Sequence, residues 1–146
     1  KKIMKNKNIK YDFYGIENIQ PVWAENFIKR ISNSKMGLNL SRGKPTKYYS
    51  SDRIAQFVGN GLVTFIHKDT KYEDFFSNDE MILYKNTDDL IKKILLLKKN
   101  DKLRKKIGRK GKYKYLKYFN STLVADYILK KTFNTKYKKR FVWENK

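Results

Sequence analysis

The chain has 146 residues, a formal net charge of +21, one histidine and no cysteine. Its length suits one domain with its own core, and a hydrophobic content of 40% argues for a folded chain despite the charge. The lack of cysteine excludes disulfides, thiolate zinc sites and cysteine nucleophiles, and a single histidine argues against a His-rich metal centre or a Ser-His-Asp triad. No apolar run is long enough to span a membrane and no signal peptide is evident, so a cytoplasmic location is expected.

The predicted elements alternate between strands and helices before three helices close the chain. We expect a strand near 9–13, a helix from 21 to about 33, a strand at 36–40, a helix from Ser50 or Ser51 to 59, a strand at 62–66, a short helix or turn at 73–76 and a strand at 81–84. Three helices follow, each beginning after a capping asparagine: Asn86, Asn100 and Asn120. This order predicts an α/β fold, a Rossmann-like and mostly parallel sheet of four or five strands flanked by helices, with basic helices at the C-terminus. Residues 1–133 form the predicted domain and 134–146 a basic tail.

Helical spacing predicts which side chains are buried. Trp23, Phe27, Ile28 and Ile31 are expected to pack on the sheet, Leu103, Ile107 and Leu116 to point inward from the second of the last three helices, and Leu123, Val124, Tyr127 and Ile128 to form the apolar face of the third. The tail after Phe133 is mostly basic and is expected to be mobile, with docking of Phe141 and Trp143 as the alternative.

The polar loop at 41–49 follows a strand and precedes a helix, which is where parallel α/β sheets bind ligands. Backbone N–H groups at the start of a helix favour an anion. Arg42, Lys44 and Arg53 place positive charge around the same point. The residue chemistry therefore indicates a ligand that carries phosphate, while an ordinary flexible loop is the alternative.

Several motifs also resemble those of one enzyme family. Four motifs resemble the C-terminal domain of GT-B glycosyltransferases. They are the segment SKMGLNLSR, the run from Arg53 to Gly61-Leu62-Val63, the acidic-aromatic patch 72–76, and the order Tyr84 to Asp88-Asp89-Leu90-Ile91. The pattern is most similar to the group-1 branch that includes spore-maturation-type glycosyltransferases. It extends from about residue 11 to about residue 133.

The resemblance implies a donor site for a nucleoside-diphosphate sugar, UDP- or GDP-linked, with no other cofactor and no metal. The donor-binding residues that it implies are Tyr14, Gly15, Ser41, Arg42, Ser50, Ser51, Arg53 and Gln56. Arg53 would contact the diphosphate and Gln56 the ribose, while no catalytic residue is assigned. The resemblance further implies a piece of a longer transferase whose N-terminal, acceptor-binding half is not in this sequence, so that this chain alone would bind donor without turnover.

Two positions depart from the family pattern. Gln56 stands where the family usually has a glutamate, and an amide both donates and accepts hydrogen bonds whereas a carboxylate only accepts. Tyr48, eight residues earlier, stands where many relatives have another glutamate. These departures leave open a degenerate domain that binds no ligand.

The positive charge is unevenly spread. Residues 11–84, which include the whole predicted site, have no net charge, whereas residues 85–118 carry +11. A solvated surface, contact with an anionic membrane, and a basic module that binds nucleic acid are the alternatives for this charge, and nucleic acid is the least favoured of the three as a partner.

Overall fold

The computed structural model describes residues 2–40, 43–135 and 141–144. Within these ranges a three-stranded parallel sheet has the order β1-β2-β3, formed by β1 (Met36–Leu38), β2 (Val63–His67) and β3 (Ile82–Tyr84). The helices are α1 (Ala24–Ser32), α2 (Arg53–Gly59), α3 (Thr87–Lys99), α4 (Asp101–Tyr118) and α5 (Ser121–Phe133). Two short 3-10 helices, η1 (Lys68–Thr70) and η2 (Tyr72–Asp74), follow β2. The predicted α/β class with a parallel sheet and flanking helices is confirmed.

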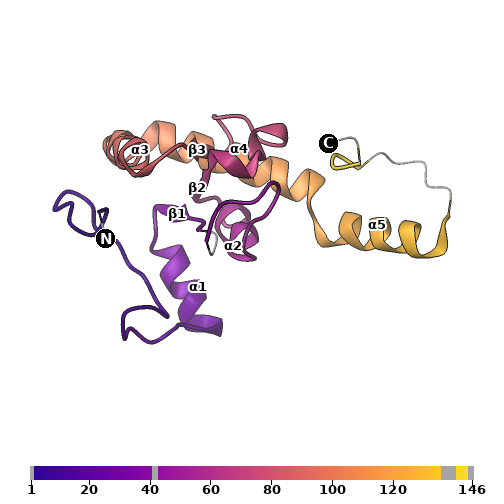
Figure 1. The fold of residues 1–146 in the computed structure, drawn as a ribbon, viewed down its shortest axis with the longest axis horizontal. Coiled ribbons are helices and arrows are strands. Elements are labelled where there is room, and N and C mark those ends of the chain that lie inside the picture. Colours follow the sequence, from indigo (N-terminus) through magenta and orange to yellow (C-terminus); the bar gives the residue numbers. More distant parts are fainter. Residues whose placement is uncertain (1, 41–42, 136–140, 145–146) are drawn as a thin grey trace.

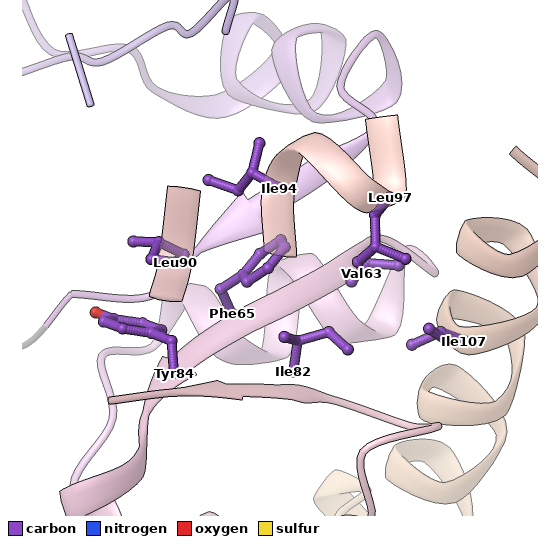
Figure 2. Close-up of a cluster of buried hydrophobic side chains, with 8 residues drawn as sticks. All are labelled: Val63, Phe65, Ile82, Tyr84, Leu90, Ile94, Leu97 and Ile107. Carbon is purple, nitrogen blue, oxygen red and sulfur yellow. The ribbon is translucent and has the colours of Figure 1, made fainter. Parts of the chain in front are cut away.

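Alternating residues of the central strand divide the core between the two faces of the sheet. On one face Val63 and Phe65 pack with Leu90, Ile94 and Leu97 of α3 (Figure 2). On the other face Ile66 packs with Ile54 and Val58 of α2 and with Phe76 after η2. This two-residue period is the signature of a strand that is covered on both sides.

The asparagines that open the last three helices cap them as predicted. The side-chain oxygens of Asn86, Asn100 and Asn120 accept hydrogen bonds from the backbone N–H groups of Asp89, Leu103 and Leu123, respectively, each close to 3.0 Å. Each bond satisfies a backbone donor that the first turn of a helix would otherwise leave without a partner.

The expected strand near 9–13 is wrong. Residues 9–13 are all described and form no strand, so the described sheet has three strands rather than four or five. The rings of Tyr11 and Phe13 do lie on one side, stacked 5.6 Å apart, as alternation requires. No strand among the described residues pairs with this segment, which leads toward α1 outside the sheet (Figure 1).

Three predictions of burial fail on the outer helices. Trp23, just before α1, is 74% exposed and Ile28 is also exposed, so that only Ile31 of the predicted set is fully buried. Leu116 of α4 is exposed, and α5, which extends beyond the end of α4 (Figure 1), has no fully buried residue. These faces are apolar in sequence, but the described chain provides nothing large enough to cover them.

In the described turn at 141–144, Phe141 and Trp143 dock on the domain, which is the alternative that the sequence left open. Phe141 is 4% exposed, and the Trp143 ring lies 5.7 Å from Phe119 and 5.6 Å from Tyr127. The short turn at 141–144 therefore packs on Phe119, just after α4, and on the middle of α5.

Candidate functional site

The loop after β1 is closed by a buried polar residue. Asn39 is 3% exposed, and its backbone N–H donates to the Phe65 carbonyl at 2.9 Å, which extends the pairing of β1 with β2 by one residue. Its side-chain oxygen accepts a hydrogen bond from the Ser51 hydroxyl. The end of the strand and the start of the next helix are therefore tied together at the carboxyl edge of the sheet.

Arg53 is held at this edge. It is the first residue of α2, its Nε donates to Ser51 Oγ at 2.9 Å, and its Nη2 donates to the Leu40 carbonyl at 3.1 Å. A guanidinium has five N–H donors in a fixed plane, so these two bonds orient the group and leave three donors for other acceptors. The side chain is exposed, so an anion in solution can reach it.

The second half of the loop packs on the segment that follows β2. Tyr48 donates from its backbone N–H to the Thr70 carbonyl at 2.8 Å and from its hydroxyl to Asp74 Oδ2 at 2.6 Å. The hydrogen bond to the Asp74 carboxylate raises the pKa of Tyr48, because the proton is shared with a charged acceptor. Tyr72 likewise donates to Ser50 Oγ at 2.9 Å. The backbone φ of Tyr48 is +60°, a conformation that a residue with a side chain adopts rarely and that these contacts hold in place.

His67 ends β2 at the same edge and acts as a local cap. Its Nδ1 accepts a hydrogen bond from the Asp69 N–H at 3.2 Å, and its ring meets Tyr84 edge-on at 5.2 Å. Because Nδ1 is already an acceptor, it is not available as a proton acceptor for a substrate in this arrangement.

The predicted site residues do not all meet. Ser51 and Arg53 are brought together, and Ser50 is bound to Tyr72 beside them. Gln56 lies exposed on α2, one turn beyond Arg53 and on the same side of the helix. Ser41 and Arg42 lie outside the described residues.

Tyr14 and Gly15 make their contacts elsewhere. The Arg30 guanidinium of α1 lies 5.6 Å from the centre of the Tyr14 ring, and the Gly15 N–H donates to the Ile19 carbonyl at 2.9 Å. Gly15 has a φ of +75° and forms a turn whose partner, Ile19, belongs to the same N-terminal segment.

The helix start differs from the prediction in two respects. It was expected at Ser50 or Ser51, whereas α2 begins at Arg53 and has seven residues. Neither serine acts as its N-cap, because that position is taken by Asp52, which makes no side-chain capping bond, while Ser51 turns to Asn39. A helix of two turns has a weak dipole, so any anion affinity at this edge depends mainly on side chains.

A cavity of about 360 Å³ opens nearby. It is lined by Asp74, Phe75, Lys114, Tyr118, Phe119 and Val142. None of the described site residues that were predicted from the sequence is among them, although Asp74 connects the cavity to Tyr48. Among the described residues there is no group of three or more His, Cys, Asp or Glu side chains that could hold a metal ion, and no helix with the length and apolar character to cross a membrane.

A family of known proteins has the same sequence pattern. The model of the family described as glycosyl transferase-like matches residues 2–130, which is most of the chain. The chain belongs to this glycosyl transferase-like family. Membership supports glycosyl transfer in general, and the match agrees with the resemblance to the C-terminal domain of GT-B enzymes. Neither the curated proteins nor the solved structures gave a match.

Sequence reasoning missed Asn39 at this candidate site, and it placed Tyr72 and Asp74 in the acidic-aromatic patch 72–76 without indicating their partners. Asn39 carried a signal, because it is a single amide in the apolar run Met36–Leu40. Tyr72 and Asp74 are 22 and 26 residues from their partners Ser50 and Tyr48, so nothing local indicated these bonds. Asp74 also bears on the missing glutamate at position 48, since it provides a carboxylate beside Tyr48 from another part of the chain.

Proposed function

We propose that this domain binds the nucleoside-diphosphate part of a sugar donor at the carboxyl edge of the sheet, with Arg53 contacting the diphosphate. The observation that carries the proposal is the Arg53 guanidinium, which is oriented by Ser51 and Leu40, exposed, and equipped with further N–H donors. Ligands of open parallel sheets bind at this edge. Membership of a glycosyl transferase-like family supports a sugar donor over other phosphate compounds.

Arg53 is suited to both binding and catalysis of transfer. A guanidinium can donate two parallel hydrogen bonds to phosphate oxygens. When the bond between the sugar and the diphosphate breaks, negative charge grows on the leaving diphosphate, so a fixed cation stabilises the transition state more than the ground state.

Gln56 is the proposed contact for the ribose. It lies one turn after Arg53 on the same exposed side of α2, so a nucleotide whose diphosphate is held by Arg53 would extend toward it. Its amide oxygen can accept a hydrogen bond from one ribose hydroxyl, which is a weaker arrangement than a carboxylate that accepts from both. The donor, UDP- or GDP-linked in this proposal, would be used together with an acceptor-binding half to complete transfer.

A thermal-shift titration tests the proposal. The chain is heated with UDP, GDP, ADP or dTDP, with inorganic pyrophosphate as the control for simple anion binding. A ligand at about 100 times its dissociation constant adds roughly 2.7 kcal/mol of stability. For a domain of this size that is a rise in Tm of about 5–10 °C. We expect this rise for one nucleoside diphosphate and a much smaller one for pyrophosphate.

Three variants locate the binding site. Arg53→Ala should abolish the shift, and Arg53→Lys should retain a reduced shift because an ammonium keeps the charge without the planar pair of donors. Arg109→Ala removes the same charge from an exposed position on α4 and should leave the shift intact. Equal shifts with pyrophosphate and every nucleotide, or a shift that Arg53→Ala leaves unchanged, would refute the proposal. No shift with any ligand would favour the degenerate domain.

A further inference from the structure

Helix α4 has a buried face and an exposed face on opposite sides. Arg104, Ile107, Gly108 and Gly111 recur at helical spacing and are buried. The two glycines bring the helix close to the rest of the domain: a Cβ on Gly108 would lie 2.1 Å from the Gly61 carbonyl oxygen, and one on Gly111 would lie 2.3 Å from that of Glu80. The helix is therefore fixed in orientation, and its opposite face is held toward solvent.

The exposed face of α4 is almost entirely cationic. Its charged members, here called the α4 basic face, are Lys102, Lys105, Lys106, Arg109, Lys110, Lys112 and Lys117. At about 100° per residue these side chains occupy one continuous side of the helix, opposite the buried set. Asp101 pairs with Arg104, which is outside this face, whereas Asp79 pairs with Lys110 and offsets one of its charges.

Two apolar side chains lie within the same face. Tyr113 is 68% exposed and Leu116 is 50% exposed, both toward the C-terminal end of the helix. The Lys117 ammonium lies 5.8 Å from the centre of the Tyr113 ring, so cation and aromatic group are presented together. A tyrosine, a leucine and lysines on one face form a surface that can place apolar groups among lipid headgroups while its charges meet phosphates.

We propose that the α4 basic face docks on an anionic phospholipid surface. Each basic residue held near such a surface contributes about a fivefold factor in affinity, so a set of this size is sufficient for stable docking without a membrane-spanning segment. Leu116 favours lipid over nucleic acid, because an exposed aliphatic group gains nothing from a phosphodiester backbone but gains from an acyl boundary. The face also has a single arginine, whereas bidentate recognition of bases and phosphates relies on arginine.

Vesicle flotation of the full 146-residue chain tests this inference. The two vesicle types are pure phosphatidylcholine and phosphatidylcholine with about one third phosphatidylglycerol. We expect binding to the second type only, weakened by added salt. Binding that is equal on both vesicle types, or absent from both, would overturn the proposal.

Matched triple variants identify the surface. Lys105→Gln/Lys106→Gln/Arg109→Gln removes three charges from the α4 basic face, and Lys5→Gln/Lys7→Gln/Lys10→Gln removes three exposed charges near the N-terminus, so each lowers the net charge from +21 to +18. The first should reduce vesicle affinity by up to about a hundredfold and the second only severalfold. Equal losses would show that net charge alone acts, which refutes a docking face. Circular dichroism and Tm confirm that both variants fold.

The variant Leu116→Ser separates lipid from nucleic acid. It should reduce vesicle binding severalfold and leave binding to a single-stranded oligonucleotide unchanged, because only the lipid surface receives the side chain. Tighter binding of the oligonucleotide than of anionic vesicles, with dependence on Lys105, Lys106 and Arg109, would overturn the lipid proposal in favour of a nucleic-acid surface.

Discussion

Substitution of Gly108 by alanine tests how closely α4 packs on the domain. An added Cβ would lie 2.1 Å from the Gly61 carbonyl oxygen, whereas ordinary contacts begin near 3.4 Å, so the two backbones must separate by about 1.3 Å. The atom in the way belongs to the backbone of the turn between α2 and β2, and it cannot rotate aside as a side chain can. The movement would also loosen the packing of Ile107, which is buried one residue before.

The magnitude follows from two opposing terms. Alanine is favoured over glycine within a helix by about 1 kcal/mol. Overpacking of a close contact costs about 1–3 kcal/mol, and a backbone obstacle places this case at the upper end. We therefore expect Gly108→Ala to lower the free energy of unfolding by about 2 kcal/mol, with a fall in Tm of about 4–8 °C.

Urea unfolding and thermal melting measure this difference, with Gly59→Ala as the matched control. A Cβ on Gly59, the last residue of α2, would meet no atom within 4 Å, so alanine there should be neutral or stabilise by up to about 1 kcal/mol. A Gly108→Ala protein as stable as the wild type would refute the close packing of α4. Equal destabilisation by both substitutions would show that the contact with Gly61 is not the cause.

Two further predictions concern the loss of stability at acidic pH and the aromatic cluster around Phe119. The Lys110 ammonium and the Ser77 hydroxyl lower the pKa of Asp79 from 3.8 to about 2, so its ion pair stabilises the fold above the usual carboxylate pKa and is lost as the pH falls through the folded value. The Tm advantage of the wild type over Asp79→Asn should accordingly be present at neutral pH and disappear between about pH 4 and about pH 2, and an advantage that does not change with pH would contradict this assignment. Phe119→Ala should destabilise the domain by about 2–4 kcal/mol in urea unfolding, because the ring stacks on Phe76 at 5.4 Å and contacts Trp143 at 5.7 Å, whereas the exposed Phe133→Ala should change stability by less than about 0.5 kcal/mol. Equal effects of the two substitutions would argue against the docked position of the C-terminal turn.

Local patterns were sufficient for the three strands of the described sheet and for the long helices, because an apolar run or a helix cap is recognised over a few residues. The asparagine caps predict the starts of α3, α4 and α5 to within a residue or two, and the apolar runs predict β2 and β3. The strand expected at 9–13 has the correct alternation and lacks only a partner. Pairing is a property of two segments, so the sequence of one segment does not predict it.

The candidate site was predictable only where it depends on chain order. Arg53 follows from the strand–loop–helix arrangement, which places the first residue of α2 at the carboxyl edge of the sheet. The bonds from Tyr48 to Asp74 and from Tyr72 to Ser50 join segments more than 20 residues apart, and no local pattern indicates them. The position of Tyr14 and Gly15 relative to the site failed for the same reason, since it depended on the strand that does not form.

Helix α4 connects the two proposed surfaces, and this makes them separable by experiment. The inner face of α4 packs on Gly61, in the turn that follows α2. Arg53 is the first residue of α2, which has only seven residues. The outer face of α4 carries the basic residues proposed to meet lipid. If the surfaces are independent, Arg53→Ala abolishes the nucleotide shift and leaves vesicle binding unchanged, and the Lys105/Lys106/Arg109 variant does the reverse.

Gly108→Ala acts on the packing of α4 against the turn after α2. A folded form of this variant should therefore weaken nucleotide binding by displacing α2, while the charges of α4 remain exposed. A Gly108→Ala protein that binds nucleotide as tightly as the wild type would mean that the position of Arg53 is determined by Ser51 and the Leu40 carbonyl, without the packing of α4 on Gly61.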